Sequence, residues 1–358
     1  TTAANAAPSS PAVDLSGFVD GRYVVQLVDD SAALYTGGIP NLQRTSPQGT
    51  DTLDDTDPAV VAYSDYLETE QEEVAASVGA DVEASLTLTL NGFVADLTVD
   101  QAIDLSLDPR VAAVTPDEVL QIDASPANEY LELDTMWGQV GGVEGAGAGV
   151  VVGVLDTGIA PENPLFAGEA LGTAEGVEPY WSGTPGDEAA RILFAKGDGQ
   201  TFTGTCQTGP GFTVEMCSTK IVGAQFFAEG AIADGFAFGT EDQVPGEYLS
   251  PRDGDGHGSH TASTAAGNHD VAITTEGGQD IGTMSGVAPE ARIAAYKVCW
   301  SGTDPASTDD DACYGTDLLA GIEAATADGV DVINFSIGGG AADSVASAYY
   351  IAFLGAAA

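Results

Sequence analysis

The sequence predicts an α/β protein of two domains, a small α+β domain followed by an incomplete parallel sheet with helices on both faces. Three observations predict this. At 358 residues the chain can bury about two cores. Its first third alternates short strand patterns with two helical patterns, and continuous apolar strands of the kind that parallel sheets bury follow from residue 149. We therefore expect domains at 21–123 and 124–358, after a flexible leader over residues 1–20.

Start and stop signals mark two helices in the first domain. Asp57 is a favourable N-cap, Pro58 fits the first helical position, and Gly79 follows the last apolar residue at helical spacing. Thr98 and Gln101 have the spacing of a capping box, which opens a short helix that runs to Leu107.

Runs of β-branched and apolar residues surround these helices and predict four strands. Asn91-Gly92 is a turn signal between the two middle strands. The expected strands are residues 22–28, 84–90, 93–97 and 111–122. The resulting order, β-α-β-β-α-β, is that of a ferredoxin-like domain.

The second domain is expected to begin with a Gly-rich linker at 124–148. A strand over 149–155 is apolar throughout and ends at Asp156, where α/β folds place functional groups, although an isolated Asp-Thr-Gly is more often only a turn. Residues 160–250 are Gly-rich and predict loops over the sheet. The other expected elements are strands at 293–298 and 330–335, a helix at 317–327 and a helix that begins within 341–358.

The stretch 250–267 holds the most informative histidine of the chain. Glycines on both sides of His257 leave the backbone open to a close approach, and the Ala/Ser/Thr-rich residues from Thr261 predict a helix that starts near His257. A general base at this position would need an orienting carboxylate from elsewhere in the chain.

Three other interpretations of this stretch stay open. His257 fits a structural histidine. It also fits a metal site together with His260 and His269, although no acidic residue stands between the first two. Asp253 and Asp255 fit the start of a calcium loop, although the later ligands of such a loop do not follow.

The charge of the chain excludes some partners. Nine Lys and Arg against 55 Asp and Glu give a net charge of −46, which opposes binding to nucleic acid and to anionic membranes. No apolar run is long enough to cross a bilayer. A surface this acidic favours a salty or extracellular setting, where ions screen its self-repulsion. We therefore expect a secreted protein without a nucleic-acid or membrane partner.

The four cysteines lie in two close pairs, Cys206 with Cys217 and Cys299 with Cys313. Their spacing favours two local disulfides and an oxidising compartment, although four cysteines allow three connectivities. Neither pair has the spacing of a zinc site.

Four ordered blocks surround Asp156 and His257 and include the two strands that follow. They are Val152–Glu162, Asp255–Asn268, Gly286–Trp300 and Asp328–Gly339. These blocks resemble the subtilisin-like serine peptidases (subtilases), in particular the branch of secreted plant and actinobacterial enzymes, with Ser259 where Thr is usual in the family. Residues 22–123 resemble the inhibitor-type propeptide of the same family.

The resemblance implies a role for each of these residues. His257 would be the general base and Asp156 would hold its tautomer, in the chain order known for subtilisin. The backbone of Ser336, Ile337 and Gly338 would pair with a peptide or protein substrate as an added strand. The segment 117–123 would occupy the same cleft as an intramolecular propeptide, with processing near residues 123–124. Catalysis would need no cofactor, a structural calcium ion fits the family without assigned ligands, and no other metal is expected.

The sequence departs from the family in one respect. It contains no Gly-Thr-Ser-Met-Ala nucleophile segment, and no Ala-Gly-Asn segment follows residue 340. We expect a precursor whose sequence is truncated before the serine, so that these 358 residues alone are inactive. The alternative is a non-catalytic inhibitor or binding protein that uses the ferredoxin-like domain, and a further hypothesis is a metal-dependent hydrolase.

Overall fold

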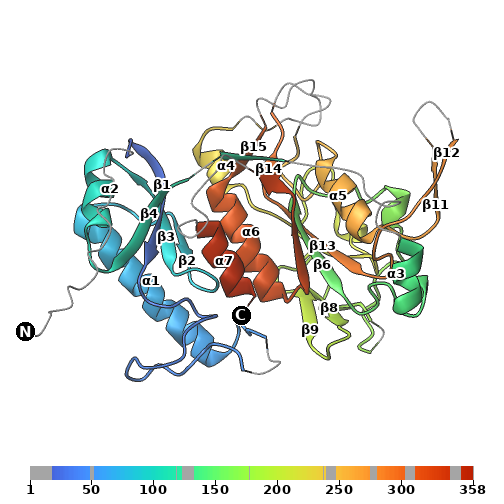
Figure 1. The fold of residues 1–358 in the computed structure, drawn as a ribbon, viewed down its shortest axis with the longest axis horizontal. Helices are drawn as coiled ribbons and strands as arrows, with labels where there is room; N and C mark the ends of the chain where they lie inside the picture. The colour runs from blue at the N-terminus through green and yellow to red at the C-terminus, as the bar shows by residue number, and fades with distance from the viewer. Residues whose placement is uncertain are drawn as a thin grey trace, which may run out of the picture.

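The computed structural model describes residues 18–48, 52–117, 119–122, 133–176, 178–236, 238, 247–274, 280–302, 311–338 and 348–357. They form two units, an N-terminal one that is blue to cyan in Figure 1 and a larger one that is green to red. Helices α6 (Gly315–Asp328) and α7 (Ala348–Ala356) belong to the larger unit and lie on the side of it that faces the N-terminal unit. The expected leader falls almost entirely outside the described residues.

The N-terminal unit has the predicted β-α-β-β-α-β order. Its antiparallel sheet has the strand order β2-β3-β1-β4, so the first and third strands are central, as in ferredoxin-like domains. Its elements are β1 (Gly21–Leu27), α1 (Pro58–Val78), β2 (Ala84–Leu86), β3 (Gly92–Leu97), α2 (Val99–Ser106) and β4 (Val111–Pro116).

The helix signals of this unit are confirmed. Asp57 accepts a hydrogen bond from the N–H of Ala59 at the start of α1, and Gly79 ends that helix in the left-handed region at φ 72°. Thr98 and Gln101 form the expected capping box at the start of α2.

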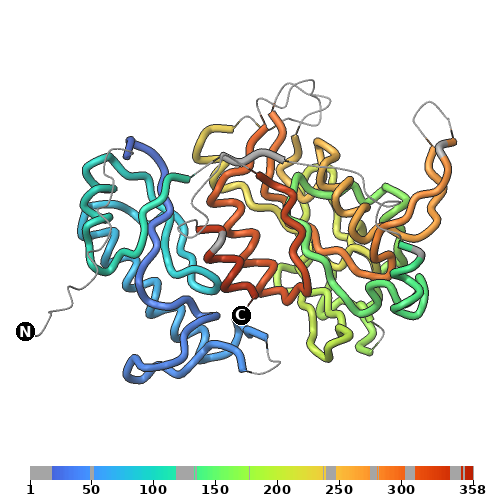
Figure 2. The backbone as a smooth tube through the Cα atoms, in the orientation of Figure 1, coloured from blue at the N-terminus to red at the C-terminus, as the bar shows by residue number. Residues whose placement is uncertain are grey.

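The prediction of a strand over 84–90 was wrong at its C-terminal end. Strand β2 stops at Leu86, because the backbone N–H groups of Leu88, Thr89 and Leu90 donate to the carboxylate of Glu323 on α6 instead of to a neighbouring strand. The loop that follows β2 lies against the red helices in Figure 2. A partner more than 200 residues away thus decides the local conformation.

The prediction of one strand over 111–122 was also wrong. Strand β4 ends at Pro116, and a separate strand β5 (Val119–Ile122) pairs with β15 (Ala312–Tyr314) and β17 (Ile337–Gly338) of the larger unit. The apolar run looks continuous in the sequence because both halves form strands, but the two strands belong to different sheets.

The larger unit is organised around a parallel sheet with the strand order β10-β13-β6-β16. All six residues of β6 are buried, as the continuous apolar run predicts. The strands are β10 (Ile221–Phe226), β13 (Arg292–Lys297), β6 (Val151–Asp156) and β16 (Val332–Phe335).

Helices cover both faces of this sheet, as expected. Asp156 of β6 accepts a hydrogen bond from Thr261 of α5 (His257–Ala266), whereas Leu155 approaches the Cα position of Gly321 on α6. Because successive side chains of a strand point to opposite faces, α5 and α6 lie on opposite sides of the sheet. Gly321 lets α6 pack closely on the sheet, since a Cβ there would meet the side chain of Val298 at 2.6 Å.

Two Gly-rich regions hold more regular structure than predicted. Residues 160–250 contain the sheet strand β10 and a three-stranded antiparallel sheet, and the expected linker at 124–148 contains helix α3, which Trp137 anchors by donating to the carbonyl of Val287 at 2.8 Å. Such short elements carry too few residues for a periodic pattern to be recognised. They are α3 (Leu133–Gln139), β7 (Tyr180–Ser182), β8 (Arg191–Ala195), β9 (Thr201–Gly204) and α4 (Glu229–Ala233).

A projecting hairpin and a short ladder complete the larger unit. The hairpin consists of β11 (Val271–Thr274) and β12 (Asp280–Met284), and it stands out from the body in Figure 1. Strand β14 (Cys299–Trp300) pairs with β15.

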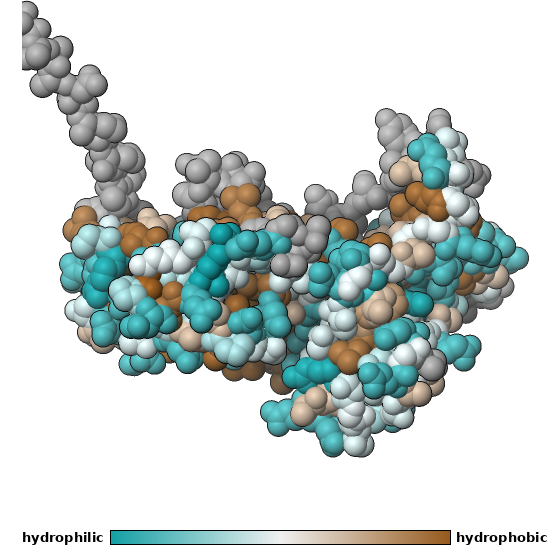
Figure 3. Space-filling model, turned by 90° about the horizontal axis from the view of Figure 1, so that it is seen from below, coloured by the Kyte–Doolittle hydropathy of each residue, from teal (hydrophilic) through white to brown (hydrophobic). Residues whose placement is uncertain are grey.

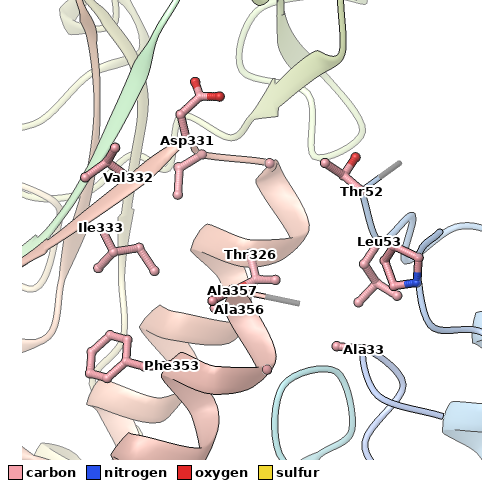
Figure 4. Close-up of a pocket in the computed structure, with 14 residues that line it drawn as sticks. Ala33, Thr52, Leu53, Thr326, Asp331, Val332, Ile333, Phe353, Ala356 and Ala357 are labelled. Atoms are coloured by element: carbon pink, nitrogen blue, oxygen red, sulfur yellow. The ribbon is translucent and has the colours of Figure 1, made fainter. Parts of the chain in front are cut away.

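Hydrophilic residues cover much of the face shown in Figure 3, and every helix in the described part of the chain is too short or too polar for a transmembrane span. A cavity of about 390 Å³ lies between the units (Figure 4), and Asp331, the one carboxylate in its lining, is already bound by Lys196 and by the N–H of Val151.

Candidate active site

Asp156 and His257 lie together at the carboxyl end of the central strand β6. The ring Nδ1 of His257 is 2.7 Å from Oδ1 of Asp156, although 101 residues separate them. The side chain of Asp156 is 1% exposed and that of His257 is 9% exposed. The strand places the carboxylate, and the first residue of α5 presents the imidazole to it, so the two motifs that the sequence singles out meet in space.

Two hydroxyl and amide donors fix the carboxylate of Asp156. Its own neighbour Thr157 donates its N–H to Oδ1 at 2.8 Å, and Thr261, one turn into α5, donates its hydroxyl to Oδ2 at 2.9 Å. Both oxygens are therefore held, and the one beside His257 faces the ring nitrogen. Because the end of β6 and helix α5 hold these two donors in place, the carboxylate of Asp156 is pre-organised to accept the N–H of the imidazole.

Two glycines let the segments approach so closely. Gly158 adopts φ 115°, and a Cβ there would meet the carbonyl oxygen of Pro251 at 2.6 Å. A Cβ on Gly258 would meet the carbonyl oxygen of Gly158 at 2.3 Å. The backbone after Asp156 thus packs directly on the backbone around His257, which only glycine allows.

Side chains satisfy the N–H groups in the first turn of α5. Asp255 accepts from the N–H of His257, Thr157 from that of Gly258, and Asp253 from that of Ser259. These donors have no partner within the helix, so the three side chains replace a single N-cap residue.

The backbone of Ser336, Ile337 and Gly338 lies beside the segment that was expected to enter the cleft. Gly338 pairs with Gln121, and Ile337 pairs with Ile122, in an antiparallel register. The hydroxyl of Ser336 accepts a hydrogen bond from Asn334 at 3.0 Å. On its other edge β5 pairs with β15, so it is an inner strand of a small ladder in the order β14-β15-β5-β17. The residues at the expected processing point, 123–124, lie outside the described part of the chain.

The cysteines form two disulfides, Cys206–Cys217 and Cys299–Cys313. Of the three connectivities that the sequence leaves open, the structure has the local one. Cys313 is also the residue of β15 that pairs with Leu120 of β5, so the second disulfide braces one side of the ladder.

The other two histidines do not join the Asp156–His257 pair. His260 is exposed, and His269 packs edge-on against Trp137. Among the described residues, no three His, Cys, Asp or Glu side chains converge as metal ligands. The expected structural calcium ion stays a prediction without assigned ligands.

The sequence reasoning missed the polar side chains behind the pair. Thr157, Thr261 and Asp253 bind its two segments together, and Lys297 and Glu247 form a fully buried ion pair near them. Asp253 stands four residues before His257, and its sequence context suggests only a calcium ligand. Its hydrogen bonds depend on how two distant loops meet, which no local pattern shows.

Comparison with known proteins places both units in families. Residues 147–356 match the Subtilase family, and residues 22–123 match the family described as Peptidase inhibitor I9. Subtilisin-like protease SBT1.6 of Arabidopsis thaliana is 39% identical over 264 residues, which cover 73% of this chain and 29% of that protein. Subtilisin-like protease SBT2.6 of the same plant is 31% identical over 324 residues, which cover 88% and 35%.

The chain spans about a third of the length of these relatives. Among solved structures, fervidolysin from Fervidobacterium pennivorans, a keratinolytic enzyme related to subtilisin, has a TM-score of 0.44 and 16% sequence identity, with 95% of this chain and 39% of that chain covered.

Proposed function

The chain belongs to the subtilase family and carries an inhibitor I9 domain before the subtilase domain, and we propose on this premise that it is the propeptide and the Asp–His portion of a secreted serine endopeptidase precursor. The observation that carries the proposal is the 2.7 Å contact between His257 Nδ1 and Asp156 Oδ1. When a buried carboxylate accepts a hydrogen bond from one ring nitrogen of a histidine, the other ring nitrogen carries the lone pair and can act as a base.

In the proposed mechanism His257 removes the proton of a serine hydroxyl through Nε2. Asp156 accepts a hydrogen bond from the Nδ1–H of His257, which keeps the ring in the tautomer whose Nε2 carries a lone pair, and its charge stabilises the imidazolium that forms. Thr157 and Thr261 hold that carboxylate in place. No cofactor is needed for these steps.

The substrate is proposed to be a peptide or protein that binds as an extended strand. Strand β5 supplies the reason, because its antiparallel pairing with Gly338 on one side and Cys313 on the other is backbone pairing that tolerates many sequences. In the precursor β5 itself occupies this place, so the N-terminal unit would act as an intramolecular inhibitor and the chain would be a zymogen.

A secreted location is proposed from two features. Both disulfides need an oxidising compartment to persist, and a net charge of −46 is best tolerated where salt screens it. The same charge is the reason why neither nucleic acid nor an anionic membrane is proposed as a partner.

The 358 residues contain no Gly-Thr-Ser-Met-Ala segment, so we propose that they do not hydrolyse peptides on their own. The test starts from the coding sequence after Ala358. A polypeptide extended through a serine segment is expected to react with a fluorophosphonate after the N-terminal unit is removed, and His257→Ala should abolish the reaction. The 358-residue chain serves as the negative control.

If no serine segment exists and no polypeptide is labelled, the peptidase proposal is wrong. Inhibition of an unrelated subtilase by the purified chain would then support the alternative, a non-catalytic inhibitor.

A further inference from the structure

Asp253 is a buried carboxylate that neither the catalytic pair nor the cleft accounts for. The residue is 8% exposed, and its two oxygens accept five hydrogen bonds. Oδ1 accepts from the N–H groups of Asp255 and Gly256 at 3.1 and 2.8 Å and from the hydroxyl of Thr157 at 2.9 Å. Oδ2 accepts from the N–H and the hydroxyl of Ser259 at 2.8 and 2.5 Å.

These bonds tie together the segments that carry Asp156 and His257. Thr157, the residue after Asp156, donates to Asp253 and accepts from the N–H of Gly258, the residue after His257. Ser259 completes a second link, because its hydroxyl donates to Asp253 and accepts from the N–H of Ala160. Both neighbours of the pair are therefore anchored on one carboxylate.

The surroundings keep that carboxylate ionised. Burial by itself raises the pKa of Asp253, but hydrogen bonds from Ser259 and Gly256 and the nearby ammonium group of Lys297 hold the pKa below its usual value. Lys297 is fully buried, donates to the carbonyl of Arg252 at 2.6 Å and pairs with Glu247. A charged acceptor binds N–H and O–H donors about twice as strongly as a neutral one.

We propose that Asp253 is a positioning residue, which holds His257 against Asp156 by clamping Thr157 and the first turn of α5. The proposal rests on the proposed function for its catalytic meaning, but the geometry it predicts is a property of this chain. A residue that only caps a helix would contribute to stability and leave the contact between His257 and Asp156 unchanged. Asp253 differs because its bonds reach the strand that carries Asp156 as well as the helix.

The test is NMR of the 358-residue chain, followed through the proton between His257 Nδ1 and Asp156. Asp253→Asn keeps the shape but removes the charge and turns an NH₂ group toward donors. We expect this proton to shift upfield and to exchange faster with water. Asp317→Asn is the control, since Asp317 is also buried and also accepts backbone N–H groups at a helix start, those of Gly230 and Ala231. It should leave the proton signal unchanged.

A second pair of variants covers the case in which Asp253→Asn does not fold. Thr157→Val removes the hydroxyl that joins Asp253 to Gly258, whereas Thr157→Ser retains a hydroxyl at this position. The first should disturb the His257 proton and the second should not. A proton signal that is the same in wild type, Asp253→Asn and Thr157→Val would overturn the proposal.

A serine-containing form of the protein gives a catalytic readout. There Asp253→Asn should lower kcat by about 100-fold with little change in KM, as expected when a catalytic group is displaced by about 1 Å. An unchanged kcat would contradict the positioning role. If no form of the protein is a peptidase, the proposed function fails, whereas the NMR result still decides whether Asp253 positions His257.

Discussion

Glu323 of helix α6 accepts a hydrogen bond from the backbone N–H of Thr89 at 2.5 Å, across a sequence separation of 234 residues. The same carboxylate accepts from the N–H of Leu88 at 3.0 Å and from the hydroxyl of Thr89. Close by, a Cβ on Gly355 of α7 would lie 2.3 Å from the carbonyl oxygen of Thr89. The N-terminal unit is therefore bound to the larger unit by its backbone and by the hydroxyl of Thr89, and Gly355 leaves no room for a Cβ beside this contact.

The first prediction concerns this contact. Glu323→Gln replaces an acceptor-only carboxylate by an amide that turns an NH₂ group toward the N–H groups of the loop. The free energy of unfolding should fall by about 1–3 kcal/mol, and the amides of Leu88 and Thr89 should lose protection in hydrogen exchange. Glu72→Gln on the exposed side of α1 is the control and should change neither. Retained protection at Thr89 would show that Glu323 does not hold the loop.

The second prediction concerns the strand β5. Successive N–H groups of a strand point to opposite sides, so replacing both Leu120 and Gln121 by proline removes ladder donors toward β15 and toward β17. Amide exchange of Tyr314 and Gly338 should then speed up. The double alanine variant keeps the N–H groups and should retain slow exchange. Fast exchange in both variants would mean that side chains, rather than backbone pairing, hold β5.

Much of the fold could be predicted because its signals are local. Asp57, Pro58 and Gly79 mark α1 whatever surrounds them, and the apolar strand that ends at Asp156 needs burial on both faces. By contrast, residues 88–90 carry a strand pattern, but their N–H groups donate to Glu323 instead. The end of strand β4 at Pro116 also depends on distant residues, because the next strand, β5, pairs with β15 nearly 200 residues later.

The same distinction applies to the candidate site. Asp156 and His257 were predicted because their flanking glycines form distinctive local motifs. Asp253, Thr157 and Thr261 are small polar residues of ordinary types, and their roles arise only when the loop before α5 packs on the end of β6. The pattern of a sequence does not show which hydroxyl will meet which carboxylate.

The third prediction compares the two disulfides. Replacing Cys299 and Cys313 by alanine should lower the free energy of unfolding by about 3 kcal/mol, because their separation of 14 residues closes a loop of about that length. It should also speed amide exchange in β5, since Cys313 pairs with Leu120. The matched control replaces Cys206 and Cys217, which are 11 residues apart and away from the ladder.

The control should cost similar stability and leave the exchange of β5 unchanged. Equal effects of both double variants on β5 would contradict a specific bracing role for Cys299–Cys313. Unfolding in urea and amide exchange on the same samples separate the two contributions.

The last prediction is that the free energy of unfolding falls as the pH rises from about 4 to about 7. Burial raises the pKa of Asp317 from 3.8 to about 7, with the charge of Asp117 adding to the rise and hydrogen bonds from Gly230 and Ala231 opposing it. Burial also raises the pKa of Asp328 to about 7, against hydrogen bonds from Tyr296 and Gln225.

The sign follows from the protons bound in each state. Between the unfolded pKa of 3.8 and the folded pKa of about 7, the folded chain holds protons on Asp317 and Asp328 that the unfolded chain has released. Raising the pH therefore favours unfolding, by up to about 1.4 kcal/mol per pH unit for each group within that window, and the effect levels off above it.

Urea unfolding from pH 4.5 to pH 8 measures how steeply the free energy of unfolding falls with pH. Asp328→Asn should flatten this dependence, because asparagine does not titrate, whereas Asp57→Asn at the exposed N-cap of α1 should leave it unchanged. A stability that rises with pH through this range would show that both carboxyl groups are ionised in the folded chain.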